Sequence, residues 1–133
     1  MKKLFLLSLM AAVLITSCSK DNEEKGGIYK GPVQKFQHGK AWTWIQIDRN
    51  NKPERIGIAI DDEAMNSLDP GGDHNGGHDH TNGLSLAFHP KASVTPFLHA
   101  LLDWNPNGHE PDGVYTLPHF DFHFYMTTEA ERK

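Results

Sequence analysis

The stretch from His119 to Met126 alternates strictly between polar and apolar side chains, and this pattern constrains the fold more than any other. Its odd-numbered positions include His119, Asp121 and His123, whereas its even-numbered positions carry phenylalanine or methionine. Successive side chains of a β-strand point to opposite faces of the sheet, so a period of two is the period of a strand. The sequence therefore predicts a strand with one face in the core and one face of potential metal ligands.

The rise of a strand limits how these ligands can share one ion. At about 3.3 Å per residue, Asp121 lies about 7 Å at Cα from each neighbouring histidine and can share an ion with either. His119 and His123, however, lie about 13 Å apart, at or beyond the joint reach of two imidazoles. We therefore expect a site here to need a ligand from elsewhere, and His109 or Glu110 can fold back beside the strand.

A ligand set drawn from these residues suits Zn²⁺, Cu²⁺ or non-haem iron. The predicted metal ligands are His109, Glu110, His119, Asp121 and His123. The alternative is a metal-free strand whose histidines and acid hydrogen-bond one another and neighbouring backbone groups.

The glycine-rich segment from residue 71 to residue 80 forms a second, weaker group of candidate ligands. It carries His74, His78 and His80 among glycines and aspartates, and imidazoles and carboxylates on a loop bind Zn²⁺, Ni²⁺ or Cu²⁺. Ordering several glycines costs conformational entropy, which favours a solvated linker instead. The sequence leaves both interpretations open.

The N-terminus has the organisation of an export signal. Lys2 and Lys3 precede an apolar run of about 12 residues, which is shorter than the roughly 20 residues of a bilayer span. The run ends in Ile-Thr-Ser-Cys at Cys18, which resembles the lipobox of bacterial lipoproteins, whose cysteine is lipidated and becomes the new N-terminus. The alternative is an ordinary signal peptide with an incidental cysteine. We expect a lipoprotein signal peptide at residues 1–17 and a membrane anchor at Cys18, in the cell envelope and most simply at the outer membrane.

Polar and charged residues follow Cys18, and such a segment buries too little apolar surface to become ordered by itself. We therefore expect a flexible tether at residues 18–33 and a β-rich domain at residues 34–133. Loss of Lys2 and Lys3 with the signal lowers the net charge from −4 to about −6. We therefore expect no basic surface of the kind that binds nucleic acid. With Cys18 as the only cysteine, the fold must depend on its core or on a metal.

Turn-forming residues divide the domain into short β-rich runs, and the first two form a predicted hairpin. The segment from Thr95 to Trp104 has both a helix-like start and a strand-like alternation. A capping box at Thr128 and Glu131 predicts a helix start near the end of the chain. The other expected elements are strands at Ala41–Ile47, Arg55–Ile60 and Gly83–Phe88 and a helix at Asp61–Leu68. The predicted fold is mainly β: a small antiparallel sandwich or barrel-like domain with one or two short helices.

The segment DWNPNGHEPDGVYTLPHFDFHFYM, from Asp103 to Met126, resembles the signature of an uncharacterised family of exported bacterial and archaeal proteins, a domain of unknown function with the pattern W-N-P-x-G-H-E-P…P-H-F-D-x-H-F-Y. A weaker likeness extends upstream to about residue 34. The resemblance implies a β-rich extracytoplasmic domain without an established activity. It also implies that a homo-oligomer is a possible assembly. For the ambiguous segment Thr95–Trp104 it favours a strand. It also implies that residues 34–133 are the N-terminal part of a longer domain, truncated at the C-terminus.

These patterns together favour an envelope lipoprotein whose β domain binds a transition metal in a sensing, buffering or accessory role. The runner-up is a metal-free structural or interaction module of the envelope, and a metal-dependent enzyme is third. No catalytic residue and no small-molecule substrate is indicated by any motif.

Overall fold

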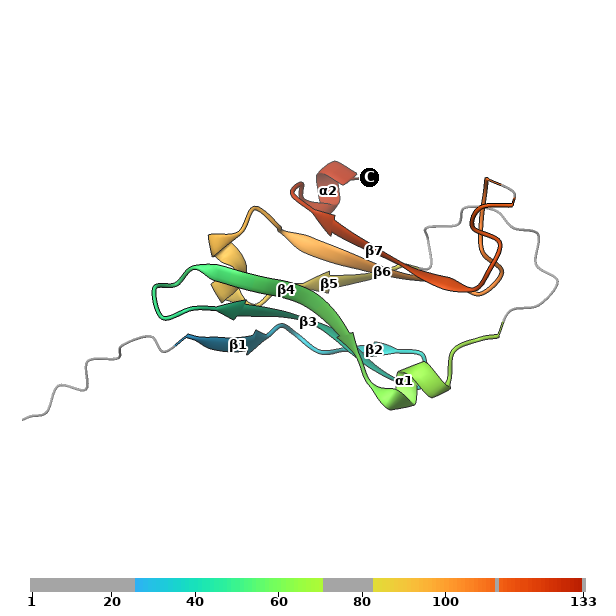
Figure 1. Ribbon diagram of the computed structural model, residues 1–133, viewed down its shortest axis with the longest axis horizontal. Coiled ribbons are helices and arrows are strands. Elements are labelled where there is room, and N and C mark those ends of the chain that lie inside the picture. The colour runs from blue at the N-terminus through green and yellow to red at the C-terminus, as the bar shows by residue number, and fades with distance from the viewer. Residues whose placement is uncertain (1–25, 71–82, 112, 133) are drawn as a thin grey trace, which may run out of the picture.

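The computed structural model describes residues 26–70, 83–111 and 113–132, which form a mainly β domain with two short α-helices (Figure 1). The elements in chain order are β1 (Gly27–Lys30), β2 (Gln34–Phe36), β3 (Gly39–Ile47), β4 (Pro53–Ile60), α1 (Asp62–Asn66), β5 (Leu84–Ala87), the 3₁₀ helix η2 (Pro90–Val94), β6 (His99–Asn105), β7 (His119–Tyr125) and α2 (Glu129–Arg132). None of the helices in these ranges is long and apolar enough to cross a membrane.

The strands form two antiparallel sheets. In the first sheet β3 is central: β4 pairs along most of its length, so β1 and β2 share its other edge, beside its C-terminal and N-terminal halves respectively. The second sheet has the order β5-β6-β7. The two sheets form separate layers and do not close into a barrel in the part of the chain described (Figure 1). Of the two predicted architectures, the layered one is therefore observed.

Side chains from both sheets form the core between the layers. Leu86 of β5 and Leu102 of β6 are fully buried and lie in one cluster with residues of β2, β3 and α1. Complete burial of a leucine side chain stabilises a fold by roughly 1.5–3 kcal/mol. Two hydrogen bonds also join the layers along β5, because Gln34 Nε2 and Thr43 Oγ1 donate to the carbonyls of Ser85 and Ala87, each at 2.7 Å.

The predicted local structure is largely confirmed. The β3–β4 hairpin forms, and the ambiguous segment after Thr95 is strand β6. In the predicted capping box, Thr128 N–H donates to Glu131 Oε2 at 2.8 Å and Glu131 N–H donates to Thr128 Oγ1 at 3.2 Å. Helix α1 is shorter than predicted but begins as expected, with the Asp61 side chain accepting from Ala64 N–H at 2.9 Å.

One predicted boundary is wrong. The sequence predicts a flexible tether over residues 18–33, but Gly27–Lys30 form strand β1, whose backbone pairs with β3. Tyr29 of this strand also packs against a second core cluster around Ile45 and Ile47. Pairing and burial order these residues despite the polar segment before them. The predicted signal peptide, Cys18 and the segment that holds His74, His78 and His80 lie outside the described residues.

Candidate metal site

The pairing of β6 with β7 places polar residues of both strands on one face of the second sheet. Asp103 lies opposite Asp121 and Asn105 lies opposite His119, and directly opposite residues of an antiparallel pair point to the same face. The intervening positions of β6, such as Leu102, point to the core. The alternation of β7 therefore places its phenylalanines on one face and the candidate ligands on the other, as the sequence predicts, although Phe122 of the apolar face is 49% exposed.

The loop between β6 and β7 brings His109 back to this face. Gly108 begins the return: its φ is +68°, and a Cβ atom at this position would meet the carbonyl oxygen of Tyr115. Glycine is the residue that accepts both conditions without strain. The next residue, His109, donates its backbone N–H to the Tyr115 carbonyl at 2.7 Å and pairs with Tyr115 in an isolated β-bridge.

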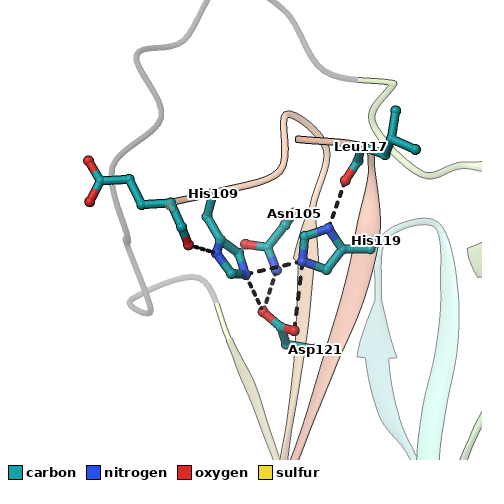
Figure 2. A network of polar contacts seen from close by, with 6 residues as sticks. Asn105, His109, Leu117, His119 and Asp121 are labelled. Atoms are coloured by element: carbon teal, nitrogen blue, oxygen red, sulfur yellow. Dashed lines mark hydrogen bonds and ion pairs between the residues drawn. The ribbon is translucent and has the colours of Figure 1, made fainter. Parts of the chain in front are cut away.

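Three side chains converge at this point (Figure 2). His109 Nε2 lies 3.0 Å from Asp121 Oδ2 and 3.1 Å from His119 Nε2, and His119 Nε2 lies 3.8 Å from Asp121 Oδ1. Their side chains are 13%, 26% and 29% exposed for His109, His119 and Asp121 respectively. One ligand atom from each of the three can therefore reach a single metal ion.

The hydrogen bond that Nδ1 of each histidine ring makes determines which ring atom faces the centre of the cluster. The Nδ1–H groups of His109 and His119 donate to the backbone carbonyls of Glu110 and Leu117, each at 2.7 Å. In a neutral imidazole the other nitrogen then carries a lone pair. Two lone pairs and a carboxylate consequently point at one another, an arrangement that requires a cation between them, either a proton or a metal ion.

The spacing fits a metal ion. Zinc lies about 2.0–2.1 Å from imidazole nitrogen, so two nitrogen ligands in tetrahedral coordination are about 3.3 Å apart. The observed separations of 3.0 and 3.1 Å around His109 Nε2 are close to this value. Ligating histidines typically donate their second ring N–H to a backbone carbonyl, and ligating carboxylates are hydrogen-bonded in turn. Asn105 supplies that bond here, with its Nδ2 donating to Asp121 Oδ2 at 3.0 Å.

A proton on His109 is the competing cation. The hydrogen bond to the Glu110 carbonyl raises the pKa of His109 above its usual 6.5; burial opposes this effect, and the charges of Asp121 and Asp103 add to it. Because the pKa is raised in the folded state, charged His109 stabilises the metal-free fold below pH 6.5, and this contribution is lost as the pH rises through the raised value.

We therefore expect His109 of the metal-free protein to titrate above pH 6.5 in an NMR experiment on its ring resonances. Asp121→Asn should lower this pKa without restoring the usual value, because the Glu110 carbonyl still accepts from Nδ1. The same histidine in the urea-unfolded chain provides the reference. Titration of folded His109 at or below the unfolded value would contradict this account of the cluster.

The structure brings together three of the five predicted ligands. Glu110 is exposed and contributes its backbone carbonyl, and its carboxylate is not part of the converging group. His123 is also outside that group, and its ring stacks on Tyr125 with 6.0 Å between centroids. Strand spacing places His119 and His123 about 13 Å apart at Cα, at or beyond the joint reach of two imidazoles to one ion.

Sequence reasoning missed the residues that support the ligands. Asn105 orients the carboxylate of Asp121, and Asp103, only 3% exposed, adds negative charge near His109. The sequence does contain a signal for them. Asp103 and Asn105 are successive odd-numbered residues of the β6 segment, so they point to the same face of that strand. The pairing register with β7 that makes this signal useful is a tertiary property.

The fold and the cluster define a class of protein: a two-sheet, mainly β domain with a group of two histidines and one carboxylate on the second sheet. No protein-family model, curated protein or solved structure matches this chain.

Proposed function

We propose that this chain is an envelope lipoprotein whose β domain binds a transition-metal ion through His109, His119 and Asp121. The observation that carries the proposal is the direction of the two imidazole rings. Each ring donates Nδ1–H to a backbone carbonyl and turns Nε2 toward the same carboxylate. The lipid anchor at Cys18 comes from the N-terminal sequence pattern.

The donor set indicates which metals suit the group. Two imidazoles and one carboxylate are a ligand set for Zn²⁺ and for non-haem Fe²⁺, and imidazole also suits Cu²⁺. The ligand side chains are partly exposed, so an ion can enter and leave from solvent. Exchange of this kind favours sensing, buffering or an accessory role over a permanently buried structural ion. A metal-dependent enzyme would need a substrate pocket at this group as well.

The alternative is a metal-free structural or interaction module. The observation that favours it is the raised pKa of His109, because an imidazolium at this position satisfies both the carboxylate and the second imidazole. The cluster would then be an internal ion pair that holds the β6–β7 loop against the sheet. The two candidates differ in whether a metal replaces the proton.

Metal content separates the two candidates. The test protein is the expected mature chain, residues 18–133 with Cys18→Ser, which contains every described residue and has no thiol. His74, His78 and His80 are replaced by Asn so that the glycine-rich segment binds no metal. After purification without air, we expect about one metal ion per chain by mass spectrometry, or a rise in melting temperature on adding Zn²⁺, Cu²⁺ or Fe²⁺. Absence of both results would favour the metal-free module.

A further inference from the structure

Strand β7 lies at the edge of the second sheet, beside the candidate metal site. It is the outermost strand of the second sheet, and within the described ranges only β6 pairs with it. Phe122, at its middle, is 49% exposed, although Phe120 on the same face packs against the core. An exposed edge strand with a large apolar side chain is a template for pairing with another strand.

The sequence of β7 is complementary to itself when it pairs antiparallel about Phe122. In that arrangement, residues equally far before and after Phe122 face each other across the two copies. Phe120 then faces Phe124, Phe122 faces its own counterpart, and Asp121 faces His123. Apolar side chains meet apolar ones on one face of the joined sheet, and the carboxylate meets an imidazole on the other.

Neighbouring registers lack this complementarity. Asp121 already faces Asp103 across β6, so centring the pair on Asp121 would place a further carboxylate directly opposite it, and like charges directly opposite each other are destabilising. Centring it on His123 would place two imidazoles opposite each other and leave Asp121 facing Tyr125. A slip by one residue would place polar side chains opposite apolar ones. Pairing about Phe122 is therefore the register that the charges of this strand favour.

This register also completes the metal site. His109, His119 and Asp121 offer three ligands, whereas Zn²⁺ in proteins takes four, with water filling a position that the protein leaves open. A residue directly across an antiparallel pair has its Cβ about 4.5–5.5 Å away on the same face, so the partner's His123 would lie beside Asp121.

Building on the proposed metal-binding function, we propose that two copies of this chain pair through β7 about Phe122. Each copy supplies His123 as the fourth ligand to the ion held by His109, His119 and Asp121 of the other. A second copy is the partner that the charge pattern fits, because the strand's own histidine complements its own carboxylate. The pairing also covers the exposed ring of Phe122 with its counterpart. His123, which lies outside the group within one chain, is thereby assigned to the ion of the partner.

The first test measures metal and mass together, in the mature chain with Cys18→Ser and the three loop histidines replaced. By sedimentation in excess Zn²⁺ we expect a dimer with one ion per chain. His123→Ala should weaken zinc binding at least about tenfold, in line with the effect of altering groups around a bound metal, and should shift the zinc-loaded protein toward monomer. His38→Ala, at an exposed histidine in a turn, is the matched control and should change neither result.

The second test measures the register. Phe122→Cys places one thiol on each side of the two-fold axis, within the range of a disulfide, so oxidised glutathione should link the two chains. Met126→Cys is the control: this position is 66% exposed, but in this register the two thiols are about 26 Å apart along the strands. We expect a covalent dimer from the first variant and none from the second.

The outcomes separate this inference from the proposed function. A zinc-loaded monomer that is unaffected by His123→Ala would overturn the pairing and leave the proposed function intact. A parent chain that binds no metal would overturn both. A dimer that Phe122→Cys does not link, or that Met126→Cys links equally well, would overturn the register and with it the role of His123.

Discussion

Replacing His119 with Ala is expected to abolish stoichiometric zinc binding and the accompanying rise in melting temperature. His119 supplies one of only two nitrogen ligands of the group, and its Nε2 lies 3.1 Å from that of His109. At a free zinc concentration one hundred times the dissociation constant, binding stabilises the fold by about 2.7 kcal/mol. For a domain of this size, that corresponds to a rise of roughly 10–20 °C.

The measurement compares thermal unfolding and metal content with and without zinc, in the background that lacks the three loop histidines. His38→Ala removes an exposed imidazole outside the cluster and should leave both quantities unchanged. If His119→Ala keeps the zinc-dependent shift of its parent, the ion is held elsewhere and the proposed ligand group is wrong. If the chain that retains the loop histidines binds zinc and the background without them does not, the glycine-rich segment is the binding site.

Replacing Leu102 with Ala is expected to cost roughly 2–5 kcal/mol of unfolding free energy. The side chain is fully buried and joins β6 to the core cluster shared by both sheets. Its loss removes buried apolar surface and leaves a cavity that the two packed layers can fill only in part. Since small domains are stable by about 5–15 kcal/mol in total, this change removes a large fraction of the stability.

Chemical denaturation of the metal-free protein measures this effect directly. Leu98→Ala is the matched control, because Leu98 immediately precedes β6 and is 53% exposed; its effect should stay within about 0.5 kcal/mol. If the two variants lose similar amounts of stability, the assignment of Leu102 to the core is wrong. Zinc should raise the stability of both variants, since neither change touches a ligand.

Much of the fold follows from local pattern and chemistry. The alternation from His119 to Tyr125 predicts a strand with the correct polar face, and the turn residues after Ile47 predict the β3–β4 hairpin. Caps at Asp61 and Thr128 also form as expected. Each signal depends on residues close in sequence, whose period or side-chain hydrogen bonds select a conformation without reference to the rest of the chain.

The errors and omissions concern residues far apart in sequence. Strand β1 was missed because a short run after a polar segment has little strand signal of its own, and its order comes from pairing with β3. The roles of Asp103 and Asn105 depend in the same way on their register with β7. No local pattern specifies the pairing of strands that are not joined by a short turn.

By itself, the amino-acid sequence determined that the chain is mainly β, that β7 has one apolar face and one ligand-bearing face, and that His119 cannot share an ion with His123 in one straight strand. Tertiary structure alone decided that His109 completes the group, that Glu110 supplies a carbonyl, and that the two rings turn Nε2 toward Asp121. The physical reason is the separation of the interacting residues along the chain. Side-chain period and strand rise depend on neighbouring residues, whereas a binding site depends on the turn at Gly108 and on strand register, which packing between distant residues sets.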